Sequence, residues 1–303
     1  MAGDAARLFK GGSGVGTDLS PLRSKYENLS GGGLASGAIS FGKLIDTTGG
    51  TIKSGGRTRR AAIMLTLKAW HPGFRAFVRL QMAGAAQAKA LIRAGYDPDF
   101  NGEAYGTVGF QNANLSVRLT DEFMNAALTG QDWQAYHVTD RRQRGPRFKA
   151  DDALRDIAKG TWVCGDPGAQ FETTIQRWHT CPNTEPINSS NPCSEYKFLD
   201  DTACNLASLR LTAFRRPDGT IDLAAYRAAV RLLFTAQEIL VGNASYPTRA
   251  VAERRYQFRP LGIGYADLGA LLMLQGLAYD SDEGRALGGL VTAVLPGEAY
   301  LVS

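Results

Sequence analysis

The order of apolar and polar residues predicts helices and strands that alternate along the chain. In residues 74–96 the apolar positions recur at helical spacing, and residues 223–234 repeat that pattern after a turn at 217–220. In residues 108–119 apolar and polar residues alternate, which is typical of a strand. Strands that alternate with helices indicate an α/β protein. Because no repeat or linker interrupts the pattern, we expect a single domain over residues 1–303.

Capping residues predict where several helices begin and end. Thr120 is expected to cap a helix that ends near Gly130, and Asp222 to cap the helix that follows it. Ser281 or Asp282 is expected to cap the last helix. These predictions rest on local chemistry alone, since each cap accepts hydrogen bonds from the first turn of its own helix.

The positions of glycines and charged residues predict the structure of three other stretches. Residues 39–45 carry the apolar face of a short helix, which we expect Gly49 and Gly50 to end. Residues 131–149 are polar and rich in arginine, so they are predicted to form a surface connection. Residues 259–277 are predicted to form a strand with close glycine packing that runs into a helix.

Composition and charge narrow the class of protein. The chain has 303 residues, 44% of them hydrophobic, which is enough to bury a large core. It has four cysteines, no N-terminal leader and no apolar run of bilayer length, so we expect free thiols in the cytoplasm and no membrane partner. The net charge of +5 is mild for this length and is as compatible with anionic nucleotides as with nucleic acid or with neither. The basic stretch 131–149 lacks the interleaved aromatic residues of a nucleic-acid surface. We therefore expect no nucleic-acid partner.

The stretch around Cys193 carries the candidate chemistry. Asn191, Cys193 and Glu195 alternate, and Pro192 fixes its own φ, so the segment is predicted to be extended. An extended backbone would point the amide, the thiol and the carboxylate to one side. That set suits a sulfur reagent flanked by a hydrogen-bonding group and a general base. The alternative interpretation is an ordinary turn with a cysteine that serves as a small hydrophobe.

Two other kinds of site are weighed against this one. No pair of the four cysteines and three histidines has the spacing of a structural zinc site. A cysteine hydrolase with Cys193 as nucleophile and His179 as base would leave Asn191, Glu195 and Cys204 without a role. We therefore expect His71 and His179 to be core or turn residues, and a redox or radical chemistry at Cys193.

Two glycine-rich loops are candidates for phosphate binding. Residues 11–16 resemble a phosphate loop, but Thr17 stands where that motif requires a lysine. The second loop is basic as well as rich in glycine, and it is either a phosphate-sensing loop or a solvated turn. Its residues are Lys53, Ser54, Gly55, Gly56, Arg57, Thr58, Arg59 and Arg60.

The run NPCSEYKFLDDTACNLASL resembles the active-site segment of the adenosylcobalamin-dependent (class II) ribonucleotide reductases. Other segments resemble that family in the same order, so the likeness covers essentially the whole chain; among them are LFKGGSGVGTDLSPLRS, IKSGGRTRRAA, CGDPGAQFETTIQRWHTCP and FRPLGIGYADLGALLM. The resemblance implies a ten-stranded α/β barrel made of two five-stranded halves. This chain would form part of that barrel and would be truncated at both ends.

The resemblance also implies roles for single residues. Cys193 would become a thiyl radical through adenosylcobalamin and abstract the 3′ hydrogen of a ribonucleotide. Glu195 would take the proton of the 3′ hydroxyl, and Asn191 would orient the substrate. Cys204 would be one of two thiols that deliver the reducing electrons. Gly14 would lie against the substrate.

Partners follow from the same resemblance. The loop of residues 53–60 would link a deoxynucleotide effector to the choice of ribonucleotide substrate, and a thiol reductant such as thioredoxin would restore the cysteines. The partner of Cys204 and the late barrel strands would lie outside residues 1–303, so we expect complementary fragments or a second copy, and no turnover by the chain alone. The alternatives are a class I large-subunit fragment and a non-catalytic nucleotide-binding or assembly fragment.

Overall fold

The computed structural model describes residues 2–52, 61–99 and 101–303. The chain forms two compact units, Met1–Asp200 and Asp201–Ser303. The described residues contain eight strands, in one sheet of four and two sheets of two. The predicted α/β class is confirmed, while the single domain and the ten-stranded barrel stay predictions. No helix in the described part of the chain combines the length and the apolar character needed to cross a membrane.

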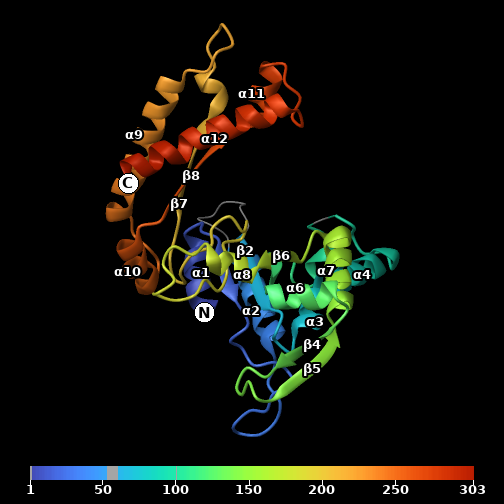
Figure 1. Ribbon diagram of the computed structural model, residues 1–303. Helices are drawn as coiled ribbons and strands as arrows, with labels where there is room; N and C mark the ends of the chain where they lie inside the picture. The colour runs from blue at the N-terminus through green and yellow to red at the C-terminus, as the bar shows by residue number, and fades with distance from the viewer. Residues whose placement is uncertain (1, 53–60, 100) are drawn as a thin grey trace. The chain divides into compact units, whose positions relative to one another are not determined.

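A four-stranded parallel sheet organises the first unit. Its strands, in spatial order, are β1 (Val15–Asp18), β2 (Ile63–Lys68), β3 (Ala113–Leu119) and β6 (Gly168–Phe171). Parallel neighbours need crossover connections, and helices supply them here. After α1 (Ala2–Lys10), the crossovers contain α2 (Ala38–Thr51), α3 (Phe74–Val78), α4 (Leu80–Arg93), α5 (Glu103–Gly106), α6 (Asp121–Leu128) and α7 (Ala150–Cys164), and α8 (Glu172–Arg177) follows the last strand (Figure 1).

The two faces of this sheet differ in polarity. On one face the odd-numbered side chains of β2 and β3 are buried, and they belong to one apolar core with side chains of α2, α3, α6 and α7. On the other face the strands present the polar even-numbered residues Asp18, Thr66, Lys68, Ser116, Arg118 and Gln170. A parallel sheet covered by helices on both faces is apolar on both. The polar face therefore marks where a segment other than a packing helix lies.

Residues 131–149 form a β-hairpin, which the sequence did not predict, although the arginines of this stretch are exposed as expected. Strands β4 (Asp132–Tyr136) and β5 (Arg144–Lys149) pair antiparallel. Trp133 and Phe148 face each other across the hairpin and pack against the core, and the indole of Trp133 donates to the carbonyl of Ala69 at 3.0 Å. The many arginines hid an alternation in which one face of the hairpin is apolar.

Two boundaries also differ from the sequence prediction. Helix α2 continues through Gly49 and Gly50 to Thr51. A Cβ at Gly49 would lie 2.4 Å from the side chain of Ile63, so glycine is required here by the contact with the sheet. These glycines allow close contact between helix and sheet, and they do not end the helix. Strand β3 begins at Ala113 rather than at 108, since the carboxylate of Asp46 accepts the backbone N–H groups of residues 110 and 112.

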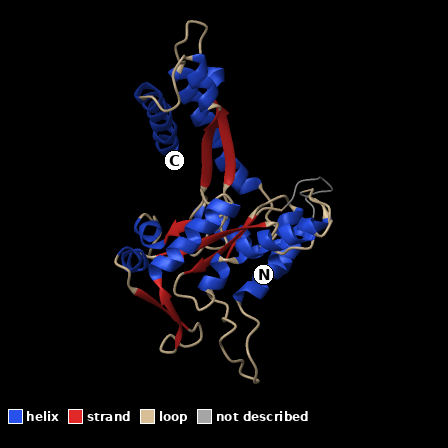
Figure 2. Cartoon of the chain, turned by 90° about the vertical axis from the view of Figure 1, so that its right-hand side faces the viewer, coloured by secondary structure: helices blue, strands red, loops and turns tan. Residues whose placement is uncertain are grey.

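The second unit is built on two parallel strands, β7 (Asn205–Arg210) and β8 (Leu261–Ala266), which lie side by side in Figure 2. The 3-10 helix η2 (Leu211–Phe214), α9 (Leu223–Asn243) and α10 (Arg249–Phe258) connect them, and α11 (Leu268–Leu274) and α12 (Asp282–Val302) follow. The core of this unit joins Tyr226 and Val230 of α9 to Val291 and Leu295 of α12.

The predicted helix caps are confirmed in both units. Thr120 accepts from the N–H of Phe123, and Asp222 accepts from the N–H of Ala225. Ser281, rather than Asp282, caps α12. Each of these caps depends only on residues within the same turn, which is why the sequence predicts them.

Glu27 ties together two loops of the first unit, and it is only 2% exposed. Its carboxylate accepts hydrogen bonds from the backbone N–H and the hydroxyl of Ser24, each at 2.9 Å. It also accepts from the N–H of Thr139 at 3.0 Å and from its hydroxyl at 2.9 Å. Burial opposes ionisation, but these hydrogen bonds outweigh it and lower the pKa of Glu27 to about 2.

Replacing Glu27 with glutamine should remove stability that depends on pH. Since the pKa of this carboxyl is lower in the folded state, ionisation stabilises the fold above the unfolded pKa of about 4.3. That contribution is lost as the pH falls through about 2. We expect Glu27→Gln to lower the free energy of unfolding by about 2 kcal/mol at pH 7, with the difference fading in acid.

Urea unfolding followed by tryptophan fluorescence measures this effect. All four tryptophans lie in the first unit, so the signal reports that unit alone. The matched control is Glu103→Gln, at an exposed carboxylate in the first turn of α5. A loss of stability in the Glu27 variant that is the same at pH 7 and pH 3 would contradict the assignment.

Candidate functional site

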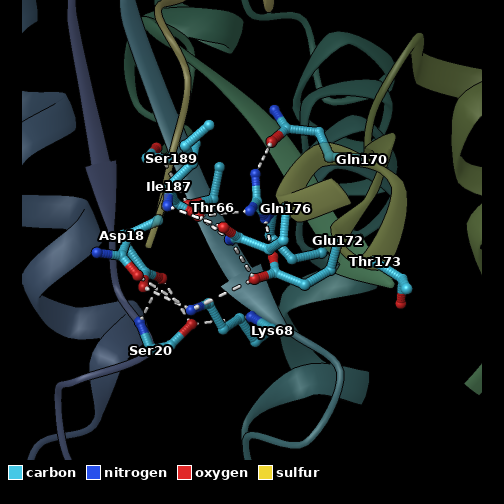
Figure 3. Close-up of polar contacts among 12 residues, drawn as sticks. Asp18, Ser20, Thr66, Lys68, Gln170, Glu172, Thr173, Gln176, Ile187 and Ser189 are labelled. Atoms are coloured by element: carbon cyan, nitrogen blue, oxygen red, sulfur yellow. Dashed lines mark hydrogen bonds and ion pairs between the residues drawn. The ribbon is translucent and has the colours of Figure 1, made fainter. Parts of the chain in front are cut away.

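The segment that carries Cys193 lies along the polar face of the four-stranded sheet. Its carbonyl at Ile187 accepts from Arg118 Nη2 at 2.7 Å, near the end of β3. Ser189 Oγ accepts from Thr66 Oγ1 at 3.2 Å, and the carbonyl of Pro192 accepts from Asn114 Nδ2 at 2.9 Å, at the start of β3. The segment therefore runs opposite to the strands, and Figure 3 shows Ile187 and Ser189 beside them.

Glycines in and before β1 make this close passage possible. A Cβ at Gly16 would lie only 1.7 Å from the carbonyl oxygen of Ser190, so no other residue fits there without moving the backbone. A Cβ at Gly14 would lie 2.7 Å from the ring of Pro192. Gly14 and Gly16 thus face the Cys193 segment, which explains these two glycines without a phosphate loop. The predicted contact of Gly14 with substrate stays a prediction.

The backbone turns at Cys193, so the prediction of an extended segment was wrong at this point. Ser194 N donates to the carbonyl of Asn191 at 3.0 Å and closes a turn, and Ser194 has a φ of +67°. Asn191 in the first position and Pro192 in the second are typical of such a turn. The alternative interpretation of these residues as turn chemistry is therefore right for the backbone.

Cys193 and Glu195 are both exposed, and Asn191 is half-buried. Asn191 is held in place twice, because its N–H donates to the carbonyl of Tyr196 at 3.2 Å and its Oδ1 accepts from Tyr196 N at 3.0 Å. The three predicted catalytic residues thus lie within or directly after one turn. Their chemical roles stay predictions.

A cluster of charged side chains around the buried Arg118 supports the start of the segment, and the sequence did not predict it. Arg118 is 0% exposed and pairs with Glu172. Lys68 Nζ lies 3.8 Å from Glu172 and 3.9 Å from Asp18, and it donates to Asn188 Oδ1 at 3.2 Å (Figure 3). The alternation of polar residues in β2 and β3 could have indicated this face, but it could not show which segment the charges bind.

The carboxyl of Asp18 belongs to this cluster. Burial raises its pKa, and hydrogen bonds from Ser20 together with the charges of Lys68 and Arg118 oppose that rise. Ser20 Oγ, which donates to Asp18 Oδ1 at 2.6 Å, also accepts from the backbone N–H of Lys68 at 2.9 Å. The cluster therefore connects β1 to β2 as well as to the Cys193 segment.

Cys204 lies in the second unit, immediately before β7, and is half-buried. A Cβ at Gly262 of β8 would lie 2.8 Å from its sulfur, so this glycine leaves room for the thiol. Gln237 Nε2 donates to the carbonyls of Asn205 at 2.9 Å and Gly262 at 2.8 Å, which ties the starts of the two strands together. The predicted close glycine packing in this strand is confirmed at Gly262.

Comparison with known proteins assigns the whole chain to one family. A family model described as the barrel domain of ribonucleotide reductase matches residues 1–303. The chain belongs to this family. A vitamin B12-dependent ribonucleotide reductase of Rhodopirellula baltica is 54% identical over 100% of the chain and 29% of its own length. A protein of the same description from Streptomyces coelicolor is 47% identical over 97% of the chain and 31% of its own length.

A more distant relative is also similar. The vitamin B12-dependent ribonucleoside-diphosphate reductase of Mycobacterium tuberculosis is 30% identical over 93% of the chain and 36% of its own length. The chain therefore spans between 29% and 36% of the length of these curated relatives.

The geometry of this reductase barrel chain argues against a cysteine hydrolase. Both ring nitrogens of His179 bind backbone groups, since Nε2 contacts the carbonyl of Glu185 at 2.9 Å and Nδ1 accepts from Cys181 N at 3.3 Å. His71 is fully buried and likewise binds backbone on both sides. The prediction that both histidines are core or turn residues is confirmed.

The remaining expectations concern metals, thiols and the basic loop. The described residues contain no group of three or more metal-ligating side chains. Cys164, Cys181 and Cys193 are free thiols, as expected. The loop predicted to sense an effector, residues 53–60, lies outside the described residues.

Replacing Gly16 with alanine should force the Cys193 segment away from β1. The added methyl would occupy the position of the Ser190 carbonyl, and overpacking of this kind costs about 1–3 kcal/mol. We expect Gly16→Ala to lower the stability of the first unit by that amount in urea unfolding followed by tryptophan fluorescence. The matched control is Gly3→Ala in α1, where a methyl meets nothing within 4 Å. Equal stability of both variants would show that the close passage does not exist.

Proposed function

We propose that this chain supplies the radical-bearing cysteine of an adenosylcobalamin-dependent ribonucleotide reductase. The observation that carries the proposal is the placement of Cys193, which lies exposed in a turn held against the polar face of a parallel sheet. The family membership and the vitamin B12-dependent relatives support it. The four-stranded sheet and the β7–β8 pair would then be parts of the two halves of a ten-stranded barrel.

Each residue of the turn has a defined task in this reaction. Cys193, as a thiyl radical, takes the 3′ hydrogen atom of the ribose, and Glu195 takes the proton of the 3′ hydroxyl. The Oδ1 atom of Asn191 is already engaged with Tyr196, so its Nδ2 is the group that donates to the substrate. Cys204 and a second thiol then deliver two electrons and become a disulfide, which a thiol reductant such as thioredoxin reduces.

Adenosylcobalamin, when bound, supplies the radical that removes the hydrogen atom of the Cys193 thiol. An exposed thiol in a turn fits a bulky cofactor that must approach the sulfur directly. Gly14 would lie beside the substrate, because it packs against Pro192, next to Cys193. The basic loop of residues 53–60 would bind the phosphates of a deoxynucleotide effector through charge-assisted hydrogen bonds.

The proposed reaction needs further chain. Because the chain spans about 30% of the length of the Rhodopirellula baltica and Streptomyces coelicolor relatives, we propose that turnover requires the remaining segments, on the same polypeptide or on complementary ones. Free thiols suit a cytoplasmic location for such an assembly.

The experiment measures deoxyribonucleotide formation with adenosylcobalamin and a dithiol, in protein that contains those remaining segments. We expect Cys193→Ser to abolish turnover, because a hydroxyl cannot replace the thiol as the radical carrier. The matched control is Cys181→Ser, which lies in the same unit outside the turn and should retain turnover. Undiminished turnover by Cys193→Ser would refute the proposal.

The same assay separates the alternatives. Turnover that needs a separate radical-generating protein and no cobalamin would indicate a class I large subunit. Absence of turnover in the unmodified protein, with all segments and the cofactor present, would indicate a non-catalytic nucleotide-binding or assembly piece.

A further inference from the structure

Ser194, the residue after Cys193, has an unfavourable backbone conformation. Its φ of +67° lies in the left-handed region, which costs a residue with a side chain about 1–2 kcal/mol. Conformations of this kind persist only where the surroundings hold them. The contacts that hold Ser194 therefore determine the path of the backbone at Cys193.

The first contact comes from Gln170 on β6, which is 4% exposed. Its Nε2 donates to Ser190 Oγ at 2.8 Å and to Ser194 Oγ at 3.2 Å. Its Oε1 accepts from Arg118 Nη1 at 3.1 Å. Since Arg118 can only donate, it fixes the orientation of the amide and leaves the NH₂ group to face the turn.

Arg118 is itself fixed from two sides. Its Nε donates to Glu172, and its Nη2 donates to the carbonyl of Ile187 at 2.7 Å. Glu172 also accepts from Gln176 Nε2 at 3.0 Å, and this amide exchanges hydrogen bonds with the backbone of Ile187. A continuous chain of contacts thus runs from α8 through a buried arginine to the hydroxyl of Ser194.

The second contact comes from Lys197, whose Nζ donates to the carbonyl of Ser194. This ammonium is half-buried, and burial together with the nearby charge of Arg118 lowers its pKa, while Glu195 opposes that shift. On the other side of Cys193, Asn114 donates to the carbonyl of Pro192. Both neighbours of the cysteine are therefore bound to side chains outside the turn.

We propose that Gln170 and Lys197 are positioning residues that hold Ser194 in its left-handed conformation and thereby fix the direction of the Cys193 side chain. Ser194 is contacted twice, by Gln170 at its hydroxyl and by Lys197 at its carbonyl. Ser194 is also the residue of the turn that has a positive φ. The consequence for catalysis rests on the proposed function, whereas the positioning itself can be measured without turnover.

Hydrogen exchange of the full chain tests the positioning. We expect Gln170→Leu and Lys197→Met each to speed exchange of the Ser194 and Tyr196 amides about tenfold, because each variant loses a hydrogen bond that holds Ser194 in place. Amides in β3 should keep their rates. Gln134→Leu and Lys149→Met are the matched controls, since both side chains donate to backbone carbonyls at the hairpin and should leave the turn unchanged.

A glycine variant tests whether Ser194 needs the two contacts because its backbone conformation is strained. Glycine adopts a positive φ without steric cost, so the conformation of Ser194→Gly needs less support. We expect Lys197→Met to change the exchange of the turn about twofold in that background, against about tenfold in the original sequence. An equal effect in the two backgrounds would overturn the inference. So would unchanged exchange in both Gln170→Leu and Lys197→Met.

Turnover in the complete protein separates this inference from the proposed function. Misdirection of the thiol should lower kcat in Gln170→Leu by about tenfold or more and leave KM close to its original value. If Cys193→Ser abolishes turnover while Gln170→Leu changes neither exchange nor kcat, the positioning fails and the function stands. If exchange responds as expected while Cys193→Ser still turns over, the function fails and the positioning stands.

Discussion

The approach of the Ser190 carbonyl to Gly16 is the constraint on which the rest of this structure depends. A backbone segment can run that close to a strand only where the strand has no side chain, and a Cβ at position 16 would be 1.7 Å from the oxygen. Gly14 and Pro192 repeat the arrangement further along. Because the segment is close, short polar side chains of the sheet, such as Thr66 and Asn114, can reach its backbone and side chains directly.

The polar face of the sheet carries a free-energy cost that apolar packing would avoid. Removing one partner of a buried ion pair such as Arg118–Glu172 typically costs about 3–5 kcal/mol, whereas replacing both by apolar residues is often neutral. The Arg118–Glu172 pair is therefore better explained by its role in positioning the Cys193 segment than by a contribution to the stability of the fold. Arg118 joins the carbonyl of Ile187 to the amide of Gln170, so one guanidinium sets both the start of the segment and the turn at Cys193.

Local chemistry made much of the fold predictable. Thr120, Asp222 and Ser281 cap helices because each accepts a hydrogen bond from the first turn of its own helix. The run around Cys193 indicated the ribonucleotide reductase family, to which the chain belongs. The end of helix α2 was predicted wrongly because Gly49 makes room for Ile63, which lies in a strand and not in the same helix. The hairpin at 132–149 was not predicted because the many arginines dominate the pattern of this stretch. Its two aromatic residues that face the core, Trp133 and Phe148, lie far apart in the sequence.

In the site, too, the features that depend on neighbouring residues were predictable, and the contacts between distant residues were not. The residue types at 191, 193 and 195 led to the proposed chemistry, but their alternation suggested an extended backbone where Asn191 and Pro192 make a turn. The polar contacts that support the turn join residues far apart in sequence, such as Thr66 with Ser189 and Arg118 with Ile187. One sequence without its relatives contains no information about which of the polar strand residues meet which part of the segment.

Disulfide trapping tests the central claim, that the Cys193 segment lies against the polar face of the sheet. Thr66 Oγ1 and Ser189 Oγ are 3.2 Å apart, so two sulfur atoms at these positions would have to approach by only about 1 Å to reach the S–S bond length of about 2.05 Å. In a chain whose four native cysteines are replaced by serine, Thr66→Cys with Ser189→Cys should form a disulfide rapidly under mild oxidation, detected by mass spectrometry. A pair formed no faster than Thr66→Cys with Thr139→Cys, which belongs to a different loop, would contradict the account.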